Sequence, residues 1–360
     1  MKKLIKIFGL FTVTGLIMSC SDSPNNSDAE NPDTTVEEDM SNIESSLDNT
    51  IELMGNLEDG SFSTAMKSFL GMSAGEITSE DWIEDVFTGM EDYIDIEATE
   101  DNRRFDFNAH RGVYSYNPNN DEWTQSSSNN ITLQFPSSEN SNSNDMTAIL
   151  SNYADAQANV DGDSYFLPTQ LLLEVEKSGE RIFAFDLKNL VYSDNPDLPV
   201  PNIVDVEIFT APFTHTLKYN KNSSTEFSFS FKVENDDLLT GIDLELKLGS
   251  DDYANLEEED LENLSGSLML TSNFTIDFDF EVGTLLTIDD PSENQINSLF
   301  NAEVKYKSFV IGQLEWSEEN EDVMIIYKDG TSESASRYYE DFVERIETVF
   351  FAFSGDWVDF

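Results

Sequence analysis

Residues 274–280 read Phe-Thr-Ile-Asp-Phe-Asp-Phe, so every second side chain is apolar and those between are polar. Side chains on a β-strand point alternately to two faces, and this period therefore predicts a strand with one buried and one solvent-facing side. The same period recurs at residues 171–176, 227–233 and 242–248. The connections mostly lack the long amphipathic helices that parallel crossovers require, so we expect antiparallel pairing.

Shorter strand-like runs extend this pattern in both directions along the chain. They are separated by clusters of Asn, Asp, Ser, Gly and Pro, which are typical of turns. These runs lie at residues 105–107, 113–116, 131–135, 304–310 and 323–327. Together they predict an antiparallel β region over residues 99–335, in which residues 113–135 form a meander.

Helical periods flank the β region. Ile43, Leu47 and Ile51 recur at the spacing of one helix face, which predicts a helical region over residues 43–98. A second apolar stripe predicts a C-terminal helix over residues 336–353 that packs on the sheet. Its members are Tyr339, Phe342, Val343, Ile346, Val349, Phe350 and Phe353. The expected class is α+β: a large, mostly antiparallel curved β-sheet with N-terminal helices and a C-terminal helix packed on it.

The start of the chain has the layout of a targeting segment. Three lysines within the first six residues precede an uncharged apolar run at 7–17, which ends shortly before Ser19 and Cys20. The run is too short to span a hydrocarbon layer of about 30 Å and fits a signal peptide over residues 1–19. Residues 20–42 are rich in Asp, Glu, Asn, Ser and Pro, so we expect a disordered acidic tether there.

The apolar residue, spacer, small residue and cysteine at 17–20 resemble the lipobox of bacterial lipoproteins. The segments 112–123, 167–187 and 327–350 together resemble uncharacterised lipoproteins of bacteroidete-type bacteria. The resemblance implies that Cys20 carries fatty acyl groups such as palmitate and anchors the protein to a membrane partner. It places the protein in the cell envelope, at either face of the outer membrane, but brings no known active site. A free thiol after an ordinary secretory signal is the alternative.

The charge balance limits the kinds of partner. The chain has 72 Asp and Glu residues against 19 Lys and Arg, which gives a net charge of −53. A protein this acidic has no electrostatic route to a phosphate backbone, so we expect no nucleic-acid binding. Neutral ligands, cations and metal ions remain possible partners.

The sequence carries no recognisable catalytic constellation. Its two histidines, His110 and His215, are far apart in sequence, and no nucleophile elbow, zincin, P-loop or dinucleotide-binding motif occurs. We therefore expect no catalytic residues, no cofactor and no resident metal, although absence of motifs leaves enzyme activity undecided. The acidic runs at 161–163 and 194–197 offer oxygen ligands for calcium, but turns explain them equally.

Trp123 and Trp316 are the candidate ligand-binding residues, with Trp357 as a further one, because indole rings stack on sugars. Rings inside strand patterns also fill cores, and that alternative stays open. Three functions are consistent with the sequence: a lipid-anchored, non-catalytic binding or structural module, a lipid or lipoprotein carrier with an apolar cavity, and a surface glycan-binding protein. The ligand and the oligomeric state are left open.

Overall fold

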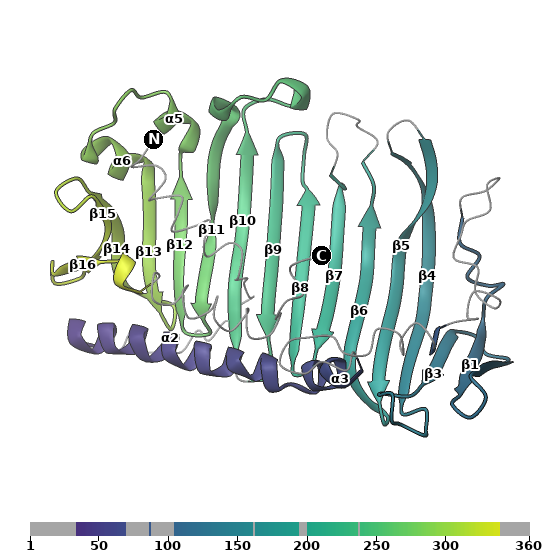
Figure 1. Cartoon of the computed structure of the whole chain (residues 1–360). Helices are drawn as coiled ribbons and strands as arrows, with labels where there is room; N and C mark the ends of the chain where they lie inside the picture. Colours follow the sequence, from purple (N-terminus) through teal and green to yellow (C-terminus); the bar gives the residue numbers. More distant parts are fainter. Residues whose placement is uncertain are drawn as a thin grey trace. The chain divides into compact units, whose positions relative to one another are not determined.

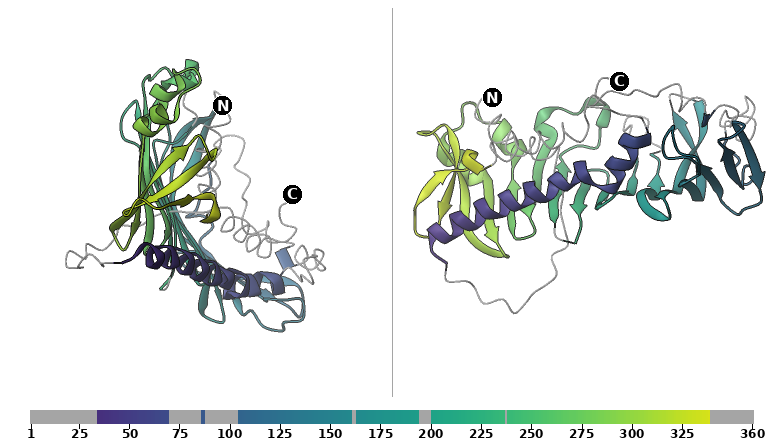
Figure 2. Two further views of the ribbon diagram at one scale, coloured as in Figure 1. Left: turned by 90° about the vertical axis from the view of Figure 1, so that its left-hand side faces the viewer. Right: turned by 60° about the horizontal axis from the view of Figure 1, so that its bottom comes forward.

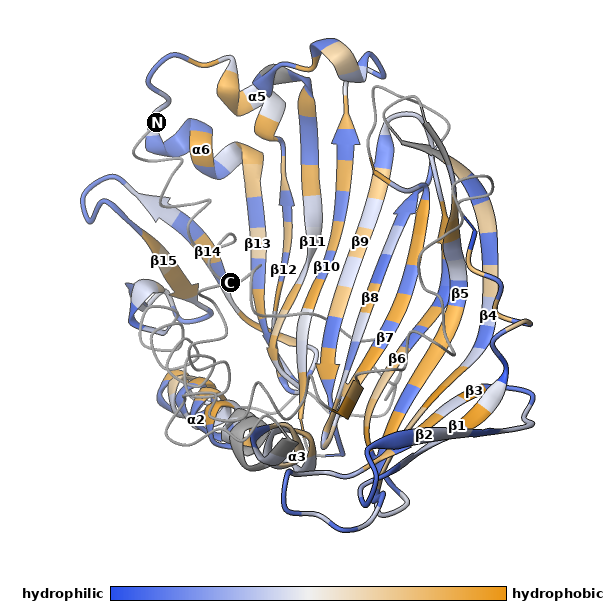
Figure 3. Ribbon diagram, turned by 45° about the vertical axis from the view of Figure 1, so that its right-hand side comes forward, coloured by the Kyte–Doolittle hydropathy of each residue, from blue (hydrophilic) through white to orange (hydrophobic). Residues whose placement is uncertain are grey.

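The computed structural model describes residues 34–69, 86–87, 104–160, 163–193, 200–236 and 238–338. The chain divides into two compact units, each described by itself below: unit 1 is residues 1–55 with 216–350, and unit 2 is residues 56–215 with 351–360. The described strands belong to a 16-stranded sheet with almost entirely antiparallel pairing, which confirms the expected α+β class (Figure 1). Within each unit the strands lie on a curved surface (Figure 3).

Unit 1 contains the alternating stretches with the clearest period. Its strands are hydrogen-bonded in the order β16-β15-β14-β13-β12-β11-β10-β9-β8, so sequence neighbours are also spatial neighbours. The strands are β8 (Phe213–Lys221, of which residues 216–221 belong to this unit), β9 (Glu226–Glu234), β10 (Leu239–Leu248), β11 (Leu261–Thr271), β12 (Phe274–Phe280), β13 (Phe300–Tyr306), β14 (Phe309–Ser317), β15 (Asp322–Tyr327) and β16 (Ser332–Ser334).

Cross-strand register sorts the side chains of unit 1 into an apolar face and a polar face. Phe278 lies opposite Ala302, whereas its neighbour Asp279 lies opposite Ser265 and Asn301. Residues that lie opposite each other on neighbouring strands share a face of the sheet, and the next residue along each strand points to the other face. The apolar and the polar side chains therefore lie on opposite faces of the sheet. The alternating colours along the strands in Figure 3 follow this division. Buried apolar side chains include Phe274, Phe280, Phe300, Val304, Leu314 and Trp316.

Helix α2 (Val36–Asp59) begins seven residues before the expected helical region, so the prediction of a disordered tether reaching residue 42 was wrong for residues 36–42. Thr35 and Glu38 cap this end reciprocally: the Glu38 carboxylate accepts the Thr35 backbone N–H at 2.8 Å, and the Thr35 hydroxyl accepts the Glu38 N–H at 3.3 Å. Val36 is buried and extends the apolar stripe of Ile43 and Leu47. A local capping pattern therefore overrides the acidic composition around it.

Replacing Thr35 with alanine is expected to lower the free energy of unfolding by about 1 kcal/mol, because the Glu38 N–H at the helix start loses its acceptor. Chemical denaturation of the two proteins measures the difference. Thr35→Ser keeps the hydroxyl and serves as the control, which should stay within about 0.5 kcal/mol of the wild type. A Thr35→Ala protein as stable as the control would mean that the helix does not begin at this cap.

Polar contacts tie α2 to the end of the sheet of unit 1. Asp39 is fully buried and accepts a hydrogen bond from the Thr34 hydroxyl at 2.7 Å, while Lys328 Nζ lies 3.6 Å from its second oxygen. Arg337, after β16, forms an ion pair with Glu44 on the helix. In Figures 1 and 2 the helix axis runs across the strand direction of this unit. In the part of the chain described, no helix is long and apolar enough to cross a membrane.

Unit 2 contains β1 (Gly112–Asn117), β2 (Glu122–Ser126), β3 (Ile131–Phe135), β4 (Met146–Val160), β5 (Asp163–Lys177), β6 (Glu180–Val191) and β7 (Ile203–Thr210). Their order is β7-β6-β5-β4-β3-β1-β2, and β1 pairs with β3 in parallel. The expected meander was therefore wrong: β2 is the outer hairpin partner, and the chain returns past β1. Tyr114 of β1 therefore lies on a strand with a neighbour on each side, and this tyrosine has no exposed surface. Helix α3 (Ser61–Phe69) packs beside β6, with the Phe62 and Phe183 rings 5.3 Å apart.

Other predicted elements are described in part. Helix α2, helix α3 and the helical residues 86–87 fall in the expected helical region, whose remaining residues lie outside those described. Residues 336–338 are helical, and the rest of the predicted C-terminal helix over 336–353 lies outside the described residues. The sequence did not predict the short helices α5 (Val282–Leu286) and α6 (Glu293–Leu299), which connect β12 to β13.

Candidate functional site

The structure places both candidate tryptophans in cores. Trp123 of β2 is 5% exposed, and its indole N–H donates a hydrogen bond to the Val86 carbonyl at 2.9 Å. Trp316 of β14 is 2% exposed, and its backbone is held by two hydrogen bonds with the side chain of Asn297, at 2.8 and 2.9 Å. Neither ring offers a free face for stacking on a sugar, so the burial supports the core-filling alternative. Cys20 and Trp357 lie outside the described residues.

The two histidines are far from any shared site. His215 of β8 is half-buried next to the Thr210 hydroxyl, 2.8 Å from its Nε2, and desolvation lowers the pKa of His215 to about 4. Its imidazole is therefore neutral at physiological pH. His110 stacks on Phe105, with the ring centroids 5.4 Å apart. Both residues belong to unit 2 and have structural contacts.

The polar face of unit 1, defined by the polar residues opposed across β9 to β13, carries several carboxylates that have local partners. Lys305 Nζ lies 2.6 Å from Asp277 and 2.9 Å from Glu303. Burial alone would lower the pKa of Lys305, but these hydrogen bonds outweigh it and raise the pKa. Asp277 also accepts the Ser267 hydroxyl at 2.6 Å, and Asp279 accepts the Asn263 amide at 2.8 Å. These acids are thus already bound within the chain.

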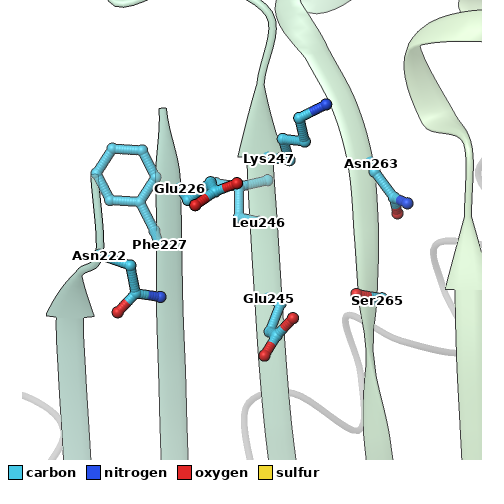
Figure 4. Close-up of a pocket in the computed structure, with 8 residues that line it drawn as sticks. All are labelled: Asn222, Glu226, Phe227, Glu245, Leu246, Lys247, Asn263 and Ser265. Atoms are coloured by element: carbon cyan, nitrogen blue, oxygen red, sulfur yellow. The ribbon is translucent and has the colours of Figure 1, made fainter. Parts of the chain in front are cut away.

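A groove of about 360 Å³ opens at one end of β9, β10 and β11, beside the residue that follows β8 (Figure 4). Six of its lining residues are polar and two, Phe227 and Leu246, are apolar. The polar ones are Asn222, Glu226, Glu245, Lys247, Asn263 and Ser265. We call this feature the polar groove. Its volume is at the lower end of the range of small-molecule sites, which is roughly 300–1,000 Å³.

Strand register brings the polar groove together. Lys247 lies opposite Glu226 on one side and Asn263 on the other, and Glu245 lies opposite Ser265. Residues two apart on a strand share a face, so these five side chains all belong to the polar face. Figure 4 shows the two carboxylates on neighbouring strands, with Ser265 and Asn263 on the next strand.

The charged side chains of the polar groove differ in how closely they are paired. Lys247 Nζ lies 2.6 Å from the Glu262 carboxylate, and this hydrogen bond raises the pKa of Lys247. Glu226 and Glu245 are both exposed. Glu226 accepts a long contact of 3.5 Å from the Ser223 hydroxyl and lies opposite Lys247, whose pKa it also raises. Within the described part of the chain, no hydrogen bond or ion pair of the Glu245 side chain is seen. The groove therefore presents net negative charge to solvent.

Sequence reasoning did not find the polar groove. The alternation in 227–233 and 242–248 predicted a solvent-facing side, but no local pattern states which residue of β10 lies opposite Glu226 or Asn263. The short connection between β9 and β10 and the longer, charged connection between β10 and β11 fix that register. Knowing the strand pairing would have been enough to bring these side chains together.

The described residues contain no group of three or more His, Cys, Asp or Glu side chains placed to hold a metal ion. Residues 161–162 and 194–199 lie outside the described part. Calcium binding and turn formation at the two acidic runs therefore both stay predictions. Comparisons with protein-family models, with curated proteins and with solved structures give no match to this chain.

Proposed function

We propose that this chain is a lipid-anchored protein of the cell envelope that binds a polar ligand in the polar groove. Membrane attachment would come from acylated Cys20, with the folded units on the water side of the membrane. The observation that carries the binding role is a groove of about 360 Å³ with six polar lining residues, five of which belong to the polar face of the sheet. The proposed role is binding without catalysis.

The composition of the groove supports a polar ligand over an acyl chain. A lipid or lipoprotein carrier needs an apolar cavity, because acyl chains gain about 0.8 kcal/mol for each methylene removed from water. Carboxylate, amide and hydroxyl groups dominate the polar groove instead. They are the groups that bind sugar hydroxyls, so of the three functions consistent with the sequence, glycan binding is the one this groove favours.

The binding role is tested by closing the groove. Ser265→Trp inserts a large ring between Glu245 and Asn263, and we expect it to abolish binding to any glycan that the wild-type protein retains on a glycan array. Glu315→Trp places the same ring on exposed β14 outside the groove and is the control. Thermal melting checks that both variants fold. A folded Ser265→Trp protein that keeps every wild-type signal would refute a ligand site here.

Replacing Cys20 with serine is expected to release the protein from the membrane fraction. The hydroxyl does not accept the lipid, and the loss of acyl chains removes several kcal/mol of membrane binding. Cell fractionation followed by immunoblotting measures the change, with Ser21→Ala as the neighbouring control. Persistence of Cys20→Ser in washed membranes would contradict the anchor and leave the groove proposal intact.

A further inference from the structure

We propose that the apolar face of unit 1 is a docking surface and that its occupant is the chain's own C-terminal segment, residues 339–350. This surface lies on the side of the sheet opposite the polar face, and the inference does not depend on the proposed function. Three features support it: the burial of the apolar face, the place where the described part of the chain ends, and the length of the segment that follows.

The middle of the apolar face is buried most deeply at β13 and β12 and less toward β9. One row of opposed residues crosses these five strands: Phe229, Leu244, Gly266, Phe278 and Ala302. Ala302 and Phe278 are 2% and 5% exposed, whereas Leu244 and Phe229 are only half-buried. A single sheet does not bury its own face, so a second layer lies over β13 and β12 and ends before β9.

The described helices of unit 1 lie toward the two ends of these strands. Helices α5 and α6 connect β12 to β13 at one end, and α2 crosses the strand direction near the other (Figure 3). Leu244, Gly266 and Phe278 lie inside their strands, between these ends. The described helices therefore account for the two ends of the apolar face, and the middle row needs a further layer.

The described part of the chain ends on the apolar side of the sheet. Tyr338, its last residue, is buried, and the Tyr338 hydroxyl donates a hydrogen bond to Glu333 at 2.6 Å. Glu333 also accepts the hydroxyl of Tyr327 at 2.5 Å. Tyr327 lies opposite Gly312, which lies opposite the buried Val304 on the apolar face. The chain therefore continues from beside β15, on the side that needs the layer.

The segment after Tyr338 has the length and the pattern for this layer. As a helix, residues 336–350 are about 22 Å long. The five strand spacings from β15 to β10 add up to about 24 Å. A helix that starts beside β15 therefore covers β13 and β12 and stops near β10, where burial falls. Its apolar stripe would face the sheet, and its acids would face water. Those acids are Asp341, Glu344 and Glu347.

Two other occupants fit this surface less well. A second copy of the chain would bring another net charge of −53 close to the first, and like charges repel. An acyl chain on the sheet would leave the apolar stripe of the C-terminal segment exposed to water, as a patch of the kind that soluble proteins bury. The stripe within this segment consists of Tyr339, Phe342, Val343, Ile346, Val349 and Phe350.

Photo-crosslinking within the full-length protein in detergent tests the inference. A benzophenone amino acid replaces either Leu244, on the apolar face, or the next residue, Glu245, on the polar face. Trypsin digestion and mass spectrometry then identify the partner peptide. We expect Leu244 to give an adduct within one molecule to the tryptic peptide 346–360, and Glu245 to give none. An adduct from Leu244 to a second copy or to a lipid in place of this peptide, or no adduct, would overturn the inference.

A charge placed in the apolar stripe gives a second test. Ile346→Glu puts a carboxylate against the sheet, whereas Thr348→Glu puts the same group on the opposite side of the helix. We expect Ile346→Glu to expose the apolar face and raise the fluorescence of the dye ANS severalfold, and Thr348→Glu to stay near the wild-type level. Thermal melting checks folding, and the adduct from Leu244 decides where Ile346→Glu does not fold. Equal fluorescence in two folded variants would contradict docking through this stripe and leave the polar groove unaffected.

Discussion

Replacing Trp316 with alanine is expected to lower the free energy of unfolding by about 3–5 kcal/mol, the cost of removing a large aromatic side chain from a core. The ring is 2% exposed and belongs to unit 1, where buried Leu314 and Val323 also lie on β14 and β15. Urea denaturation of the purified protein measures the difference. This is the largest effect that we predict for a single side chain.

Two control variants show whether burial of the ring causes this loss. Val310→Ala lies on the same strand, where Val310 is 47% exposed, and should cost less than about 0.5 kcal/mol. Trp316→Phe keeps most of the apolar volume and removes an indole N–H that is buried without a partner in the described part, so it should lose much less than alanine. A Trp316→Ala protein with wild-type stability and reduced sugar binding would restore the stacking role.

Replacing Gly266 with alanine is expected to destabilise unit 1 by about 1–3 kcal/mol or more, because the added methyl would lie 2.0 Å from the backbone oxygen of Asp243. Neither atom can move without disturbing the pairing between β10 and β11, in which Gly266 lies opposite Leu244. At an open strand position the same change would instead stabilise the protein. A loss of stability in Gly266→Ala, in place of a gain, therefore indicates that the Asp243 backbone lies this close to Gly266.

Gly55→Ala is the matched control, because no atom lies within 4 Å of the position that its methyl would take on helix α2. It should stabilise the protein by about 0.5–1 kcal/mol, the usual difference between alanine and glycine in a helix. Thermal melting of both variants tests the pair. A Gly266→Ala protein as stable as Gly55→Ala would mean that β10 and β11 do not pair in this register.

The sequence was sufficient for β9, β10 and β12, because strict alternation over 227–233, 242–248 and 274–280 indicates burial on one face directly. The single strand expected over 304–310 was wrong, because residues 307–308 form the turn between β13 and β14. The sequence was less informative where composition and local chemistry disagree. Thr35 and Glu38 form a capping box inside an acidic stretch. The composition of that stretch predicted disorder, so the start of the helix was not predicted. Net composition averages over a segment, whereas a cap depends on two residues.

Features that depend on pairing between distant residues could not be predicted. The parallel pairing of β1 with β3 requires knowing that the chain returns past β1, and nothing local encodes that. Trp123 and Trp316 fit both a core and a ligand site from their strand patterns, and only their burial separates the two. The polar groove likewise appears only once Glu226, Lys247 and Asn263 are in register.

The most direct measurement of the central claim is the NMR response of asparagine side-chain amides to a glycan that the wild-type protein retains on the array, using protein labelled at asparagine. A ligand site in the polar groove predicts concentration-dependent shifts for Asn222 and Asn263, which line the groove, and none for Asn301, which lies on the polar face outside it. Shifts at Asn301 as large as those at Asn263, or saturation binding that leaves both groove amides unchanged, would contradict a ligand site in the polar groove.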